Sequence, residues 1–304
     1  MRIAVVTPHY PPVSHGGISE SVRAFVRELS KRYEVRVYWP RNAIWISGIP
    51  IFLPRVEEEA IYCHGIEFPS SLVCMGERGL LHVHAFYEDC SIFDSPVRRA
   101  GCFLVKGLRR SYRKVAVVAE WLLELFPNGE VVRPIIELPE PGWRGGDYLL
   151  YVGKLAREKG FDDFLRLVRE VGLRGVAVGG GANREDVRGR VGNVELLGWV
   201  PREELLKLMS SALAVVSPSR CEGFSLTAAE SVAMGVPFIG REIPGIREVV
   251  GESYPLLASS LREFVEHVRS VLRGEIPKME RERLLRLMDP EENVRRLINL
   301  GGWG

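Results

Sequence analysis

Two glutamates, Glu222 and Glu230, stand eight residues apart in the segment of the chain best suited to bind a ligand. Glu222 lies in a polar loop, and Glu230 falls about one turn into the helix predicted after it. We expect Ser225 to cap that helix, whose free N–H groups can bind phosphate. Each carboxylate oxygen accepts two hydrogen bonds, so the pair suits a ligand with hydroxyl groups. An exposed loop residue beside a helix-face residue, with no ligand, accounts for the spacing equally well.

Glycines and cations follow other predicted strands. Gly16 and Gly17 directly precede a predicted helix, where backbone N–H groups can approach an anion. Lys154 and Lys159 lie in the loop after a strand, where they can neutralise a diphosphate. Taken alone, the glycine pair is better explained by a tight turn, and the lysines by a solvated loop, than by a phosphate site. The glycine run 179–181 lacks the G-x-G-x-x-G spacing, so a dinucleotide site is not supported.

The apolar pattern alternates between strands and helices. Apolar runs predict strands at 3–7, 35–39, 60–63, 80–84, 115–119, 148–152, 175–178, 194–197, 214–216 and 237–239. Helical spacing predicts intervening helices, among them 162–171, 202–210 and 226–234. Breakers in 139–146 mark a linker. The predicted fold class is therefore α/β, with two doubly wound parallel-sheet domains at 1–143 and 144–288.

The C-terminal segment 289–304 is predicted to form a helix that can pack back on the N-terminal domain. Asp289 is a suitable N-cap, and Glu292 is placed to complete a capping box. In open parallel sheets, ligands bind beyond the carboxyl ends of the strands. The loops after the predicted strands are therefore where we expect the site.

Several stretches resemble one enzyme family. The string Glu222-Gly223-Phe224-Ser225 followed by Glu230 resembles the E-x7-E signature of retaining GT-B glycosyltransferases of the family 4 type. Residues 151–160 resemble the opening of that family's second domain, and residues 193–201 resemble its segment beside the nucleotide base. The start of the chain, with Thr7-Pro8, Tyr10-Pro11-Pro12 and Gly16-Gly17, is similar to the family's acceptor domain. The likeness is strong over 148–250, moderate over 1–40 and thin over 41–110.

The resemblance implies a GT-B fold, with two Rossmann-like domains facing across a cleft, and transfer of a hexose-type sugar from a UDP or GDP donor with retention of configuration. Glu230 would hold the ribose hydroxyls, and Glu222 would hold the donor sugar. Lys154, where the family more often has Arg, and Lys159 would neutralise the diphosphate. The implied donor-binding set is Gly16, Gly17, Gly153, Lys154, Lys159, Trp199, Val200, Pro201, Glu222, Gly223, Phe224, Ser225, Leu226 and Glu230. Closure of the two domains would complete this set.

The same resemblance implies that Glu222, Lys159 and His84 are catalytic. His84 best resembles the histidine that the acceptor domain places near the donor sugar, and His64 is the alternative. His82 fits a satisfied core histidine, and its shared strand face with His84 offers two metal ligands with no third evident, so no metal site is expected. In a front-face reaction the leaving diphosphate accepts the acceptor's proton, so neither metal nor cofactor is needed.

A basic segment adds a second interaction surface. Between Ser95 and Ala119 there are seven cations and no acidic residue, and Val97, Leu104 and Leu108 recur at helical spacing. Such a helix can contact an anionic lipid surface or a glycan or lipid-linked acceptor, or it can be a solvated face packed on the sheet. The candidate acceptor or membrane residues are Arg98, Arg99, Lys106, Arg109, Arg110 and Arg113.

Composition limits which partners, cysteine chemistry and cellular location the protein can have. The net charge of +2 argues against nucleic acid as a partner. Five cysteines without a C-x-x-C pair argue against a metal cluster or a disulfide framework, and they favour a reducing cytoplasm. No window approaches 18 apolar residues, so contact with a membrane would be peripheral. The chain has no Gln, and Arg far outnumbers Lys, which hints at a hot habitat.

Two rival functions stay open. A non-catalytic module that binds a sugar or nucleotide would keep the fold without transfer. An epimerase or phosphorylase of GT-B shape would act on sugar phosphates instead. Release of free nucleoside diphosphate only when an acceptor is present would separate transfer from both rivals.

Overall fold

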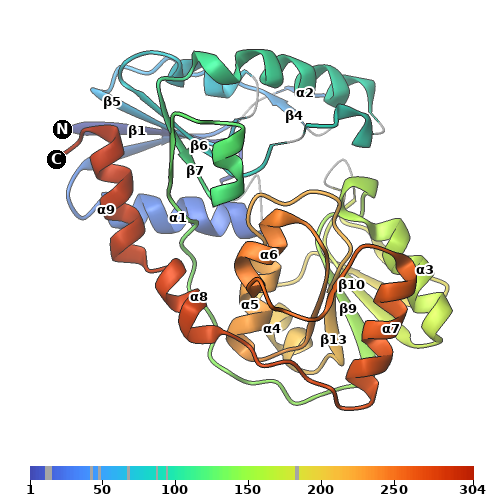
Figure 1. Ribbon diagram of the computed structural model, residues 1–304. Coiled ribbons are helices and arrows are strands. Elements are labelled where there is room, and N and C mark those ends of the chain that lie inside the picture. The colour runs from blue at the N-terminus through green and yellow to red at the C-terminus, as the bar shows by residue number, and fades with distance from the viewer. Residues whose placement is uncertain are drawn as a thin grey trace. The chain divides into compact units, whose positions relative to one another are not determined.

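The computed structural model describes the 304-residue chain apart from residues 11–15, 42–43, 47–48, 67–68, 87, 94 and 182–184. Pro11 and Pro12 of the family-like N-terminal motif therefore lie outside the described residues. The chain divides into two compact units, the first formed by 1–137 with 286–304 and the second by 138–285 (Figure 1). The sequence-based boundaries at 143 and 289 lie within six residues of these divisions.

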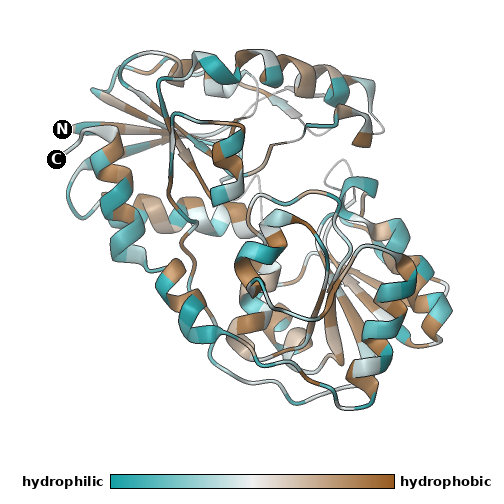
Figure 2. Ribbon diagram, in the orientation of Figure 1, coloured by the Kyte–Doolittle hydropathy of each residue, from teal (hydrophilic) through white to brown (hydrophobic). Residues whose placement is uncertain are grey.

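The first unit contains a six-stranded, wholly parallel sheet in the order β2-β1-β5-β6-β7-β8. Its strands are β1 (Arg2–Val6), β2 (Glu34–Tyr38), β5 (Ala60–His64), β6 (Gly79–Val83), β7 (Lys114–Val117) and β8 (Gly129–Val131). The central strands are continuously apolar because both of their faces are covered, and Figure 2 shows this hydrophobic character. The strand order reverses between β1 and β5, where a doubly wound sheet opens a crevice at its carboxyl edge.

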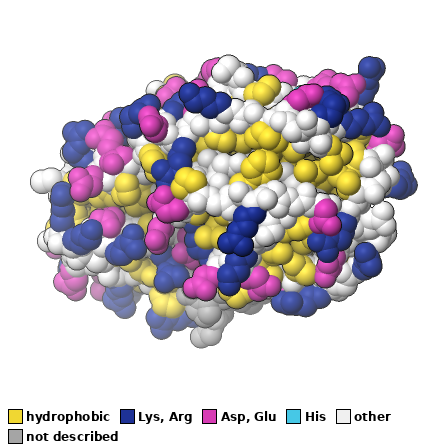
Figure 3. All heavy atoms as spheres, turned by 90° about the horizontal axis from the view of Figure 1, so that it is seen from below, with side chains coloured by type: hydrophobic (Ala, Val, Ile, Leu, Met, Phe, Trp, Pro, Cys, Tyr) yellow, Lys and Arg dark blue, Asp and Glu magenta, His cyan; other side chains and the backbone are white. Residues whose placement is uncertain are grey.

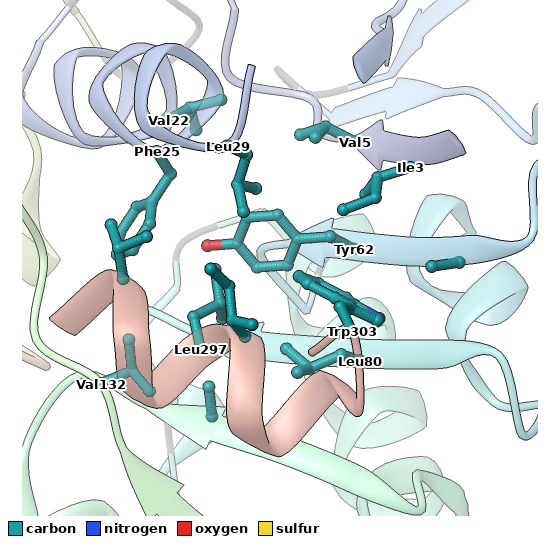
Figure 4. Packing of buried hydrophobic residues seen from close by; sticks show 14 of the residues in the cluster. Ile3, Val5, Val22, Phe25, Leu29, Tyr62, Leu80, Val132, Leu297 and Trp303 are labelled. Atoms are coloured by element: carbon teal, nitrogen blue, oxygen red, sulfur yellow. The ribbon is translucent and has the colours of Figure 1, made fainter. Parts of the chain in front are cut away.

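Two helices distant in sequence build the core beside this sheet. Helix α1 (Gly17–Leu29) and helix α9 (Pro290–Gly301) contribute Phe25 and Leu297, which pack around Tyr62 of β5 together with Trp303 (Figure 4). The Asp289 side chain caps α9 by accepting from the backbone N–H of Glu292 at 2.7 Å, as predicted. The Glu292 carboxylate accepts from Arg295 and Arg296. Helix α8 (Arg281–Leu287) leads into α9.

The peripheral part of the first unit holds elements that the apolar pattern did not predict. These are the antiparallel hairpin of β3 (Ile44–Ile46) and β4 (Ile49–Ile51), and the 3₁₀ helices η1 (Ser70–Cys74), η2 (Cys90–Ile92), η3 (Arg109–Ser111) and η4 (Glu120–Glu124). Helix α2 (Pro96–Leu108) lies within the predicted basic segment. Ser95 is its N-cap, and the Ser95 side chain accepts from the Arg98 N–H.

The expectation that the cysteines are unpaired is wrong. Cys63 is bonded to Cys74, and Cys90 is bonded to Cys102, with Cα–Cα distances of 6.1 and 5.7 Å. Each pair joins a strand or turn to the helical segment that follows it along the chain, a proximity that cysteine spacing alone does not reveal. Cys221, in the second unit, takes no part in a disulfide.

The second unit contains a seven-stranded sheet in the order β11-β12-β10-β9-β13-β14-β15, parallel except for β11 against β12. Its strands are β9 (Tyr148–Val152), β10 (Arg174–Val178), β11 (Arg188–Val191), β12 (Val194–Gly198), β13 (Ala214–Ser217), β14 (Phe238–Arg241) and β15 (Leu257–Ala258). Because β10 and β13 flank β9 on opposite sides, the order reverses between β9 and β13. The loops after these two strands therefore border the expected ligand crevice.

Among the described residues of the second unit, helices and one 3₁₀ turn connect the strands. They are η5 (Arg157–Lys159), α3 (Phe161–Val171), α4 (Arg202–Ser210), α5 (Leu226–Met234) and α6 (Pro244–Val250), and α7 (Leu261–Leu272) follows the last strand. Helix α5 is almost wholly buried. Within the described ranges, no helix is long and apolar enough to cross a bilayer. On the face drawn in Figure 3, positive and negative side chains are interspersed, in keeping with the small net charge.

Candidate functional site

The loops after β9 and β13 touch through their backbones. Gly160, at the start of α3, has a φ of 70°, and a Cβ at this position would overlap the carbonyl oxygen of Pro218. Only glycine combines this left-handed conformation with so close an approach at low cost. The contact brings Lys159 and Glu222 to the same edge of the sheet.

Lys159 and Glu222 form an ion pair at that edge. Lys159 Nζ lies 2.8 Å from Glu222 Oε1 and 3.5 Å from the carbonyl oxygen of Cys221. Both side chains are partly exposed, at 24% and 19%, so the pair can still meet a ligand. Lys159 and Glu222 were predicted as separate ligand contacts, whereas their side chains are paired with each other.

Arg220 holds the loop after β13 against α3, a role that sequence reasoning missed. Its guanidinium donates to both carboxylate oxygens of Asp162, each at 2.9 Å, and to Asp163 at 2.7 Å. Arg241 donates to the same oxygen of Asp163 at 2.7 Å. Although burial raises the pKa of Asp162, the hydrogen bonds and charge of Arg220 outweigh it and lower that pKa below its usual value. The loop that carries Glu222 is therefore braced by a charged network.

The helix that follows Glu222 begins as predicted. Ser225 is the N-cap of α5, and its side chain accepts from the Ala228 N–H at 3.3 Å. Gly245, near the start of α6, packs so closely on the backbone of Glu222 and Gly223 that a Cβ would overlap their carbonyl oxygens. The Phe224 side chain is buried, and Leu226 opens the helix. The first-turn N–H groups of α5 thus lie directly after Glu222.

Glu230 lies on α5 and is paired with Arg202, the first residue of α4. The Glu230 side chain is only 8% exposed, whereas that of Arg202 is 35% exposed. A ligand hydroxyl that bonds to Glu230 would therefore join or displace a guanidinium. Arg202 was missed, although it directly follows the predicted base-side residues Trp199, Val200 and Pro201.

Trp199 is fixed by its backbone. Its N–H donates to Asp186 at 2.9 Å, and its carbonyl oxygen accepts from Arg188 at 3.0 Å. The indole ring packs against Gly180, where a Cβ would collide with Nε1, and the residue remains 36% exposed. The glycine run after β10 therefore makes room for this side chain.

Lys154 lies in the loop after β9, next to Gly153. Its Nζ is 3.4 Å from Glu158, which is buried. The buried Tyr151 hydroxyl donates to the carbonyl oxygen of Lys154 at 2.6 Å and also contacts that of Lys159 at 3.3 Å. The loop that carries both lysines is therefore held to β9 by one tyrosine.

The predicted residues of the first unit fall at two places. Gly16 caps the start of α1 and Gly17 is its first residue, and both are exposed. His84 follows β6, and its ring stacks on that of His64 at a centroid distance of 3.9 Å. His82 is a satisfied core histidine, as predicted, since Nδ1 is 2.7 Å from the Tyr62 hydroxyl and Nε2 is 2.8 Å from Val132 O. The expectation that no third histidine joins His82 and His84 is wrong, because His64 does.

The basic segment forms α2 and η3, and no residue of either is buried. Phe103 is 64% exposed and Leu104 41% exposed. Several cations have partners within the unit: Lys106 donates to Glu88 O, Arg113 pairs with Glu77, and Arg109 lies over the Phe86 ring. Arg98 lies over the Phe93 ring, and Arg99 donates to the Phe93 carbonyl.

The second unit thus presents a helix N-terminus, a lysine–glutamate pair and a buried glutamate one turn further on. Residues 146–274, which contain all of these groups, match the family described as glycosyl transferases group 1. The second unit belongs to the glycosyl transferases group 1 family. Among curated relatives, O-antigen chain mannosyltransferase B of Escherichia coli is 32% identical over 133 residues, which cover 40% of this chain and 34% of that protein. The match therefore spans about a third of that relative's length.

Solved structures extend the likeness to the whole chain. Sucrose-phosphate synthase from Thermosynechococcus elongatus has a TM-score of 0.75 at 18% identity, with 98% of each chain covered. The Anabaena protein HepE, solved in complex with UDP and glucose, has a TM-score of 0.71 at 12% identity, again with 98% of each chain covered. At these identities the likeness shows the fold, which is the GT-B fold of two Rossmann-like domains. The family and fold predicted from the motifs are confirmed.

Proposed function

We propose that this protein is a retaining glycosyltransferase that moves a hexose-type sugar from a UDP or GDP sugar to an acceptor. The observation that carries the proposal is the Lys159–Glu222 pair placed directly before the N-terminus of α5. A cation, free N–H groups and a carboxylate at one point are what a sugar diphosphate needs. Similar proteins support this choice, since one is an O-antigen chain mannosyltransferase and another was solved in complex with UDP and glucose.

In this proposal the diphosphate takes the place of Glu222 beside Lys159. Its oxygens accept from the Lys159 ammonium and from backbone N–H groups in the first turn of α5. The released Glu222 carboxylate accepts from donor sugar hydroxyls, and Glu230 accepts from the ribose hydroxyls beside Arg202. Trp199, Val200 and Pro201 border the base, next to Gly153 and Lys154 of the β9 loop.

The transfer step we propose is a front-face displacement. The bond between the anomeric carbon and the diphosphate oxygen breaks, and the bond to the acceptor oxygen forms on the same face of the sugar. The diphosphate oxygen takes the acceptor's proton, so Glu222 acts as a binding group and not as a nucleophile. Lys159 stabilises the departing negative charge, and neither metal nor cofactor enters the step.

For the acceptor we propose a glycan or lipid-linked molecule handled by the first unit, with peripheral contact to an anionic membrane. Helix α2 supports this because its exposed Phe103 and Leu104 accompany Arg98, Arg99, Lys106 and Arg110. Sedimentation with liposomes tests it. Binding to anionic but not zwitterionic vesicles, lost in Phe103→Ser, supports the surface, whereas equal recovery in both supernatants argues for a solvated helix.

The site of action we propose is the cytoplasmic side of a cell from a hot habitat. The Arg-rich, Gln-free composition supports this, and intracellular disulfides occur chiefly in hyperthermophiles. A melting temperature above about 90 °C would agree with this habitat, whereas an ordinary mesophilic value would contradict it.

Thermal shift across UDP, GDP, ADP, CMP and their sugar conjugates tests the donor site. A ligand at 100 times its dissociation constant stabilises the folded state by about 2.7 kcal/mol. Stabilisation by one nucleoside diphosphate, followed by its acceptor-dependent release and a product with the donor's anomeric configuration, would support the proposal. Binding without release favours the non-catalytic module, and conversion of a sugar phosphate without acceptor-dependent release of nucleoside diphosphate favours an epimerase or phosphorylase.

A further inference from the structure

Four of the six histidines in the chain gather at one edge of the sheet in the first unit. His64 is the last residue of β5, and His82 and His84 lie on and just after the neighbouring β6. In the parallel register His64 is directly opposite His82. Side chains two residues apart on a strand share a face, so the three rings form one cluster beside the point where the strand order reverses.

The hydrogen bonding of this cluster is incomplete among the described residues. Both ring nitrogens of His64 and Nε2 of His84 are buried with no hydrogen-bond partner there. His64 is fully buried, and a buried polar atom left unpaired destabilises the folded state. Such atoms in a folded protein call for a partner of another kind, for which a water molecule or an ion is the usual candidate.

His82 has the arrangement of a metal ligand with its orienting partner. Val132 O can only accept, so the 2.8 Å contact requires that His82 Nε2 carries the proton. Nδ1 then holds a free electron pair, which accepts from the Tyr62 hydroxyl at 2.7 Å. A ligating histidine typically donates its second N–H to a backbone carbonyl in this way. An ion would replace the Tyr62 hydroxyl at Nδ1.

We propose that His64, His82 and His84 bind one divalent transition-metal ion of the zinc type. One ligand nitrogen from each residue lies within 4.8 Å of the other two. Nitrogens around a tetrahedral zinc ion are about 3.3 Å apart, given bond lengths of about 2.0–2.1 Å. Rotation of the His64 and His84 rings closes the difference, because both nitrogens of His64 and Nε2 of His84 have no partner among the described residues.

The donor set determines the class of ion. Three neutral imidazoles suit zinc, cobalt, nickel and copper, whereas magnesium and calcium require oxygen ligands. His9, which follows β1, lies close enough for its charge to act on both His64 and His84, and it offers a fourth nitrogen. The ion has no part in the transfer step proposed above, in which groups of the second unit act. A ligand role for His84 takes the place of the catalytic role that the resemblance implies for it.

Titration with Co²⁺ tests the site directly. The full chain is used without a polyhistidine tag, stripped with a chelator, and free of nucleotide. We expect one Co²⁺ per chain, with visible d–d bands and no thiolate charge-transfer band, and displacement by Zn²⁺. The absence of the thiolate charge-transfer band separates the cluster from the Cys221 thiol.

Variants then assign the ligands. His64→Asn and His84→Asn should each weaken Co²⁺ binding by at least about tenfold, in line with the effect of losing even an outer-shell partner. His267→Asn is the matched control, since His267 bonds to Leu257 O in the second unit. Absence of binding to the folded wild-type chain, or equal affinity in all variants, would overturn the proposal.

A readout on the wild type covers the case in which a variant does not fold. X-ray absorption of the Zn²⁺-loaded chain counts the imidazoles around the ion. Three or four imidazoles support the site, and fewer than three overturn it. Because no sugar nucleotide is present in any of these measurements, their failure leaves the proposed transferase function untouched.

Discussion

The ammonium nitrogen of Lys159 and a carboxylate oxygen of Glu222 lie 2.8 Å apart, although the two residues are 63 positions apart in sequence. The pair neutralises itself, so a sugar diphosphate has to exchange one partner for another. The exchange is favourable because Lys159 gains the phosphate as its new partner and Glu222 gains the sugar hydroxyl groups. The two residues should therefore respond differently to mutation.

Lys159→Ala should weaken binding of the preferred nucleoside diphosphate and lower kcat about 100-fold, the effect of losing one charge-stabilising donor. Calorimetric titration and initial rates measure both quantities. Lys207→Ala, which removes an exposed lysine from α4, is the matched control. Normal turnover of Lys159→Ala would exclude the diphosphate role.

Glu222→Gln should lower kcat while nucleoside diphosphate binds as tightly as before or more tightly. The substitution removes the internal partner of Lys159, so the diphosphate no longer competes with a carboxylate. The free nucleotide and the sugar nucleotide are titrated in parallel. A loss of affinity for the nucleotide alone would show that Glu222 supports the loop and does not bind the sugar.

Glu230→Ala should remove the preference of the protein for a ribonucleotide over its 2′-deoxy analogue. Hydrogen bonds to a charged group are worth about 1.5–3 kcal/mol, so we expect roughly a tenfold loss of affinity for the ribonucleotide. The exposed Glu204→Ala on α4 serves as the control. If the variant still discriminates between the two sugars, Glu230 serves only to hold Arg202.

Acid should destabilise the first unit through its buried histidines. Burial lowers the pKa of His82 from 6.5 to about 4, and it lowers the pKa of His64 and His84 well below their usual range. Between pH 6.5 and about 4 the unfolded chain binds more protons, so stability falls as the pH falls through this window. His82 alone accounts for about 3 kcal/mol.

Denaturant unfolding with a chelator present, at a series of pH values, measures this loss. His64→Asn should show a shallower dependence on pH because it removes one such group. His267→Asn should keep the wild-type slope. A wild-type stability that is flat across the window would contradict the burial of neutral rings.

The two disulfides can be counted chemically. Thiol titration of the denatured chain should find one reactive thiol, that of Cys221, without reductant and five after reduction. Cys90→Ser with Cys102→Ser should lower the unfolding free energy by about 3 kcal/mol, as expected for a short loop. Five reactive thiols before reduction would show that neither bond forms.

The sequence predicts those parts of the fold in which local pattern and burial agree. The buried strands, such as Tyr148–Val152 and Arg2–Val6 after its first residue, are apolar because both faces of each sheet are covered. Short elements such as Ile44–Ile46 carry too few residues for a periodic signal. The Ser225 and Asp289 caps were predicted because capping chemistry is local.

The site was predicted less completely because its partners are distant in sequence. The motif identifies Glu230, but its partner Arg202 is 28 residues away. Arg220 meets Asp162 across 58 residues, and nothing in the spacing indicates that contact. His64 joins His82 only through the register of two strands. Tertiary contacts of this kind require the topology of the sheet.

The return of residues 286–304 to the first unit also affects how the chain is synthesised. Leu297 and Trp303 fill the core around Tyr62, so that core lacks one wall until these residues have left the ribosome (Figure 4). The second unit, whose residues are continuous in sequence, can fold earlier even though its synthesis begins later. The nascent N-terminal half must therefore keep its exposed apolar face from aggregating while the other half matures.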